Sequence, residues 1–177
     1  MAAKVKEQLD ELHRISEDQW ARYQQMLPTS DDVSLVVLKG HLIIEEMLYA
    51  IALEHCAKPD ELAKARLTFA QLLHMVCALT KIPVMEACSP AISLLNTIRN
   101  SLVHNLEPKE LEPRLHALQK LCEPTDFEYP PNYVKPTELP RIAESCICFL
   151  IGGLNVIGIV AALVEKNPQM LVRTNVS

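Results

Sequence analysis

Glycine, aromatic residues and excess positive charge are all scarce in this chain of 177 residues. It contains only 4 glycines, and three of them (Gly152, Gly153 and Gly158) lie in one late segment. So few glycines argue against a glycine-rich phosphate loop, a propeller or a β-sandwich with many tight turns. The 17 basic and 22 acidic residues give a formal net charge of −5. A domain that coats duplex nucleic acid would be basic, so we expect any contact with nucleic acid at a small local site.

The six cysteines form no recognisable disulfide framework or zinc motif. The segment from Met1 to Asp18 is charged and lacks the apolar core of a secretory signal. No Cys-x-x-Cys pair meets a histidine pair at zinc-finger distance. Cys146 and Cys148 lie in an apolar run, which favours buried thiols. We therefore expect reduced thiols in a cytoplasmic protein, with neither a metal site nor a cofactor.

Apolar residues recur at helical spacing almost throughout, and no segment alternates in the manner of a β-strand. This pattern predicts an all-α protein, an antiparallel helical bundle. We expect four parts, which are an N-terminal amphipathic helix (1–28), a helical core (29–122), a proline-rich loop (123–140), and an apolar C-terminal helix with a tail (141–177).

Capping residues and prolines predict the helix ends inside the core. Cap-type residues, Ser30, Asp31 and Asp32, precede a predicted long helix over about 33–56. Pro59 starts the next predicted helix, which runs to about residue 79. Ser89-Pro90, an N-cap residue followed by proline, predicts the start of the helix that carries His104.

One apolar segment, Cys146 to Val164, holds 19 residues without a charge, about the length that crosses a bilayer. A tail anchor and a helix buried within a bundle or a dimer both fit this length. Asn155 lies in the middle of this segment, and no aromatic residues flank the segment in the manner of a membrane belt. We therefore favour the buried helix and do not expect membrane contact.

The stretch LLNTIRNSLVHNL, residues 94–106, separates into two faces when it is drawn as a helix. One face is apolar, and the other carries Asn96, Asn100 and His104 at i, i+4 and i+8, with Arg99 beside Asn100. Asn100 lies one turn before His104, so we expect its amide to hydrogen-bond the imidazole. Arg99 and His104 lie about 140° apart around an ideal helix, so they need a distorted helix or a second subunit to hold one small group.

The segment Arg99-Asn100-Ser101-Leu102-Val103-His104 resembles the signature of the HEPN superfamily, in which an arginine, a polar residue, a short spacer and a histidine lie on a late helix of a bundle. The preceding long helix, with KGHLIIEEMLYAIALEHC over residues 39–56, is similar as well. The resemblance covers roughly residues 31–121. It implies a homodimer in which the motif helices of two chains line a cleft, where many members of the family cleave RNA without a metal ion.

The resemblance also implies a role for each motif residue. Arg99 would hold the scissile phosphate and stabilise the charge that develops on it. His104 would act as general base on the ribose 2′-hydroxyl or as acid on the leaving oxygen. Asn100 would orient the imidazole or contact the phosphate, and Asn96 and Ser101 would support it. The products would be a 2′,3′-cyclic phosphate and a 5′-hydroxyl, and a toxin-type effector of this kind would have an antitoxin or another protein partner.

Two features disfavour the nuclease interpretation. Some ribonuclease members carry tyrosine two residues after the histidine, where this chain has Leu106, and the net charge of −5 suits a promiscuous RNA binder poorly. The alternative is a non-catalytic HEPN-like binding or regulatory module that acts through protein or small-ligand contacts, as the all-helical mannitol-operon repressor family does. Arg99 and Asn100 would then belong to a solvated polar face, and His104 would lie at the negative end of the helix dipole.

A second polar stripe follows the predicted long helix, where His41, Glu45 and Tyr49 recur at i, i+4 and i+8, with Glu46 beside Glu45. One hypothesis places Glu45 or Glu46 across the cleft, paired with Arg99. The alternative is an exposed helix face with local pairs of little energetic value. A histidine and a glutamate at this spacing can also bind a metal, but no third and fourth ligand is evident.

Overall fold

The computed structural model describes residues 2–80, 82–105, 108–123 and 133–166, and these residues form an all-α fold. The helices in chain order are α1 (Ala2–Met26), α2 (Val33–Glu54), α3 (Pro59–Ala65), α4 (Phe69–Leu79), α5 (Pro83–His104), α6 (Leu111–Leu121) and α7 (Leu139–Lys166). The predicted helical class is therefore confirmed. Three predicted features lie outside the described residues: most of the proline-rich loop, the tail that follows Lys166, and the position of Leu106.

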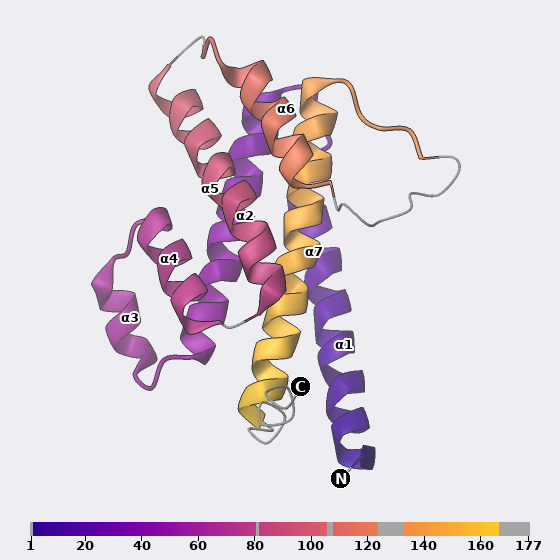
Figure 1. The fold of residues 1–177 in the computed structure, drawn as a ribbon, viewed down its shortest axis with the longest axis vertical. Helices are drawn as coiled ribbons and strands as arrows, with labels where there is room; N and C mark the ends of the chain where they lie inside the picture. Colours follow the sequence, from indigo (N-terminus) through magenta and orange to yellow (C-terminus); the bar gives the residue numbers. More distant parts are fainter. Residues whose placement is uncertain (1, 81, 106–107, 124–132, 167–177) are drawn as a thin grey trace.

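Helix α7 runs along the centre of the molecule. It packs against α1, α2, α5 and α6, while α2 also packs against α4 and α5. Figure 1 shows α1 beside α7 along one edge, and α3 with α4 at the opposite edge. The largest fully buried side chains come mainly from α2, α5 and α7, and they include Ile44, Leu48, Ile92, Leu95, Ile147 and Leu150.

The two central helices approach each other closely at Gly40 of α2. A Cβ atom at this position would lie 2.2 Å from Cδ1 of Ile147 on α7. Gly153 has a similar role on α7, where a Cβ atom would lie 2.8 Å from Sγ of Cys88 on α5. The helices meet at these points because glycine has no side chain to separate them.

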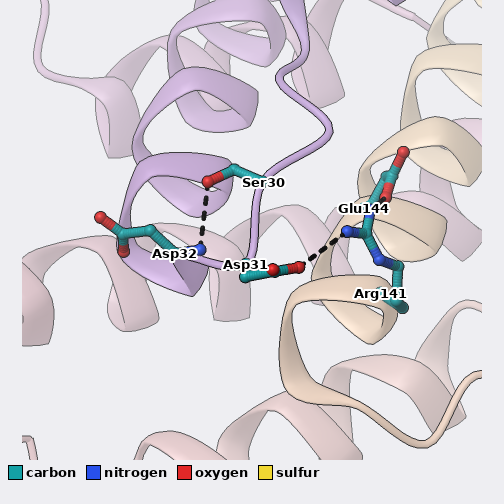
Figure 2. Close-up of polar contacts among 5 residues, drawn as sticks. All are labelled: Ser30, Asp31, Asp32, Arg141 and Glu144. Atoms are coloured by element: carbon teal, nitrogen blue, oxygen red, sulfur yellow. Dashed lines mark hydrogen bonds and ion pairs between the residues drawn. The ribbon is translucent and has the colours of Figure 1, made fainter.

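The start of α2 follows the predicted capping pattern. The Asp32 carboxylate accepts hydrogen bonds from the backbone N–H groups of Ser34 (2.8 Å) and Leu35 (3.3 Å), two donors that have no partner inside the helix. Figure 2 shows the neighbouring Asp31 paired with Arg141, whose Nη2 lies 3.1 Å from the Asp31 carboxylate. This pair connects the loop before α2 to the first turn of α7.

The single helix predicted over about 59–79 is wrong, because the chain forms two helices there. Arg66 ends α3 in a left-handed conformation, with φ 47°. Thr68 then begins α4 with a capping box, in which its hydroxyl accepts from the Gln71 backbone N–H and the Gln71 side chain accepts from the Thr68 N–H. These two local signals separate segments that the apolar pattern had joined.

The predicted helix start at Ser89-Pro90 is also wrong. Helix α5 begins at Pro83, with proline in its first turn, and Pro90 lies inside it. Proline has no N–H to donate to the carbonyl of Glu86, four residues earlier. The Ser89 hydroxyl donates to that carbonyl instead, at 3.3 Å, which satisfies the acceptor and lets the helix continue.

Among the described helices, one segment (Leu139–Leu163 of α7, hydropathy 2.5) is long and apolar enough to cross a membrane by length and composition. The core helix of a soluble bundle meets the same criterion. In the fold, α7 has four neighbouring helices and buries Ile142, Ile147, Leu150 and Leu154 among them.

Candidate functional site

The two polar stripes meet where α2 packs against α5. Nε2 of His41 lies 3.1 Å from Oδ1 of Asn96, so an N–H of the ring donates to the amide oxygen. The His41 side chain is buried, with 2% of the residue exposed, and its ring stacks on Phe69 of α4 with 4.1 Å between centroids. With its proton on Nε2, the neutral ring presents Nδ1 as a hydrogen-bond acceptor.

The other ring nitrogen of His41 has no hydrogen-bond partner. Nδ1 is buried, and Oε2 of Glu45 lies 4.0 Å away. Burial lowers the pKa of His41 because it removes water from the charged ring. The Asn96 hydrogen bond and Glu45 raise the pKa and nearby Arg99 lowers it, but the net shift is downward. The ring is therefore neutral at neutral pH, and two acceptors, Nδ1 and the Glu45 carboxylate, face each other.

Arg99 and Asn100 form a pair on α5. Nη1 of Arg99 donates to Oδ1 of Asn100 at 3.0 Å, and both residues are half-buried. The expected bond from Asn100 to the His104 ring is not found, and the Asn100 amide oxygen accepts from Arg99 instead. Asn100 thus orients the guanidinium instead of the imidazole.

His104 is the last residue of α5 and is exposed. The helix ends directly after it, because Asn105 adopts an extended conformation. The Ser101 carbonyl accepts from both the backbone N–H of Asn105 (3.1 Å) and its side-chain amide (3.0 Å). Neither of the two cavities described for this chain is lined by Arg99 or His104. A single chain therefore presents the two motif side chains separately.

Within one chain, Glu45 and Glu46 do not pair with Arg99. The hypothesis that one of them pairs with Arg99 across a cleft stays a prediction. Glu46 lies 2.8 Å from Nη1 of Arg22, which comes from α1. Glu45 points toward the His41 ring. Among the described residues, no ion pair joins Arg99 to either carboxylate. The pairing of Glu46 with Arg22 could not be predicted, because the residue pattern along α2 does not indicate that α1 packs beside it.

The same two glutamates line a cavity of about 350 Å³ between α2, α3 and α4. Its other lining residues are Tyr49, Leu62, Ala63, Arg66, Leu67 and Leu72. Tyr49, predicted as a supporting residue, is therefore placed in this cavity. Sequence reasoning missed Arg66, which joins the cavity lining at the point where α3 ends. The signal in the sequence was the capping pair Thr68 and Gln71, which marks the start of a new helix directly after Arg66.

Other residue types that carry chemistry offer little in the described part of the chain. No three histidine, cysteine, aspartate or glutamate side chains there lie close enough together to hold a metal ion. All six cysteines are free. Burial raises the pKa of Cys88 and of Cys148, so both remain protonated thiols, which are weak nucleophiles, at neutral pH.

Comparison with known proteins returned no match. No protein-family model matches the chain, and no curated protein and no solved structure is significantly similar to it. The resemblance to HEPN domains therefore depends on the motif residues and the order of the helices.

Proposed function

We propose that this protein is a HEPN-like domain that acts as a metal-independent endoribonuclease of the toxin-effector type at the cleft of a homodimer. The observation that carries the proposal is the pair of groups at the end of α5. The Asn100 amide holds the Arg99 guanidinium, and the exposed imidazole of His104 follows five residues after Arg99. A fixed cation and a free acid–base group are the two elements that RNA transesterification needs.

In this mechanism the protein positions an RNA phosphate and moves two protons. Arg99 uses one N–H on Asn100, and its remaining donors hold the non-bridging oxygens of the phosphate as negative charge develops. His104 removes the proton from the ribose 2′-hydroxyl, which attacks the adjacent phosphorus, or protonates the leaving 5′-oxygen, and the His104 of the second copy carries out the other proton transfer. The bond to the 5′-oxygen breaks, leaving a 2′,3′-cyclic phosphate and a 5′-hydroxyl.

A second copy of the chain completes such a site. Arg99 and His104 point about 140° apart on one helix, so the arginine of one copy and the histidine of the other meet the same phosphate. The exposed apolar side chains Leu42 (56%) and Val103 (50%) support this arrangement. They adjoin His41 and His104 in sequence, on the two helices that carry the site.

The deciding experiment is cleavage of a labelled mixed-sequence RNA in EDTA. We expect cleavage by the wild type, with cyclic-phosphate ends, and a loss of about 100-fold or more in His104→Ala and in Arg99→Ala. His74→Ala is the matched control, because His74 is an exposed histidine on α4 and is not part of the motif on α5. Equal cleavage by all four proteins would identify a contaminating nuclease and end the proposal.

A non-catalytic binding or regulatory module is the second candidate. The net charge of −5 favours this second function, because an acidic chain repels the phosphate backbone of RNA. The cavity that Glu45 and Arg66 line together also favours it. A folded wild-type dimer that cleaves no RNA in the experiment above would select this function.

A further inference from the structure

The cavity between α2, α3 and α4 combines features that are characteristic of a small-ligand site. Its volume of about 350 Å³ falls within the range of such sites, roughly 300–1,000 Å³. Leu62, Leu67 and Leu72 supply apolar lining, while Glu45 and Arg66 add one charge of each sign. A few charged groups on an apolar wall fix the orientation of a bound molecule.

Glu45 is the negative charge that the fold leaves uncompensated there. Its side chain is 40% exposed, and its carboxylate lies 4.0 Å from Nδ1 of His41. That nitrogen has no hydrogen to donate, because the proton of the neutral ring is on Nε2, which contacts Asn96. The other carboxylate of the lining, Glu46, is already neutralised by Arg22. Water reaches the exposed part of the Glu45 carboxylate, and a cationic N–H group that enters the cavity can replace this water with a charge-assisted hydrogen bond.

Arg66 supplies the opposite charge. It ends α3, its side chain is exposed, and among the described residues it has no ion-pair partner. A guanidinium presents a planar set of N–H donors that fits a carboxylate. Tyr49, half-buried in the same lining, adds a phenol that can donate or accept.

We infer that this cavity binds a small zwitterion whose ammonium group contacts Glu45, whose aliphatic middle packs against the leucines and whose carboxylate contacts Arg66. The site lies within one chain and requires neither RNA cleavage nor a dimer. It is therefore independent of the proposed nuclease function.

Three ω-amino acids of increasing length test the inference by calorimetric titration: 4-aminobutanoate, 6-aminohexanoate and 8-aminooctanoate. We expect saturable binding of at least one of them. Hexylamine and hexanoate each lack one of the two charges, and we expect each to bind at least about 10-fold more weakly than the best zwitterion. Absence of saturable binding by all three zwitterions would overturn the inference.

Variants connect the binding to the cavity. Glu45→Gln removes a charge at constant side-chain size, and Arg66→Gln removes a charge while keeping a shorter polar side chain. Each is expected to weaken binding of the best zwitterion about 10-fold or more. Glu86→Gln is the matched control, because Glu86 is an exposed glutamate on α5 outside the cavity lining. Equal affinity in all of these variants would place the binding elsewhere and refute the site.

Discussion

His41 is a polar side chain at a position where the helical pattern alone would place an apolar one. One of its ring nitrogens donates to Asn96, while the other is buried without a partner. A buried polar atom without a hydrogen bond costs about 1–3 kcal/mol. This cost opposes the stability that the hydrogen bond to Asn96 and the stacking on Phe69 contribute.

His41 should make the fold less stable as the pH falls below neutrality. Its folded-state pKa is lowered from 6.5, so on acidification the unfolded chain binds a proton first. The free energy of unfolding then decreases from about pH 6.5 downward, until the folded ring also titrates, by about 1.4 kcal/mol per unit of pKa difference. We predict that the stability of the wild type relative to His41→Gln falls between pH 8 and pH 5, as measured by urea unfolding.

The control for this prediction is the same substitution at an exposed histidine of α4, His74→Gln. A wild-type advantage over His41→Gln that grows on acidification would show that the folded chain favours the charged ring, and would contradict the prediction.

The sequence predicted which residues of the polar stripe share a helix, but not which side chains they contact. The polar stripe with Asn96 and Asn100 lies on one helix as expected, because helical periodicity determines it. Its contacts differ, because Asn96 meets His41 and Asn100 meets Arg99. Contacts of this kind depend on which helices pack together and on side-chain rotamers, and a pattern along one helix contains neither.

Helix ends depend on short-range chemistry, and the sequence was informative only where that chemistry was unambiguous. One of the three predicted cap-type residues, Asp32, caps α2, because its carboxylate and the free N–H groups are neighbours in the chain. Thr68 caps α4 in the same way but was missed inside a continuous apolar pattern. Pro90 misled because a nearby hydroxyl, that of Ser89, replaces the hydrogen bond that proline lacks.

The packing of α2 on α7 depends on Gly40. Three atoms of the Ile147 side chain would lie between 2.2 and 2.9 Å from a Cβ atom at this position, and Ile147 is fully buried. The isoleucine has no free space to move into, because protein interiors are close-packed. An added methyl group would therefore force the two central helices apart.

We predict that Gly40→Ala destabilises the fold by about 1–3 kcal/mol, the usual cost of overpacking, although alanine is the better helix former. Gly152→Ala is the matched control on α7, since no atom lies within 4 Å of its added Cβ. The control should raise stability by up to about 1 kcal/mol. Urea unfolding of both variants measures the difference, and a stabilised Gly40→Ala would show that the helices do not approach as described.

At the scale of the whole molecule, charge and site geometry lead to the same requirement. A chain with a net charge of −5 gains little from long-range attraction to RNA, so binding must come from local contacts. One copy presents Arg99 and His104 in different directions, which leaves too few local contacts for a phosphate. Pairing of two copies through α2 and α5 would bring two arginines and two histidines together.

We therefore predict a particle of twice 19.9 kDa by light scattering on the eluate of a sizing column. Leu42→Arg places a charge on the exposed face of α2 and should yield a monomer that has also lost RNA cleavage, because charge is disfavoured at the centre of an interface. Val134→Arg is the matched control: Val134 is 84% exposed and lies in the segment before α7, so this variant should remain dimeric and active. A folded Leu42→Arg protein that stays dimeric would place the interface on other helices, and an active monomer would show that one chain suffices to hold the phosphate.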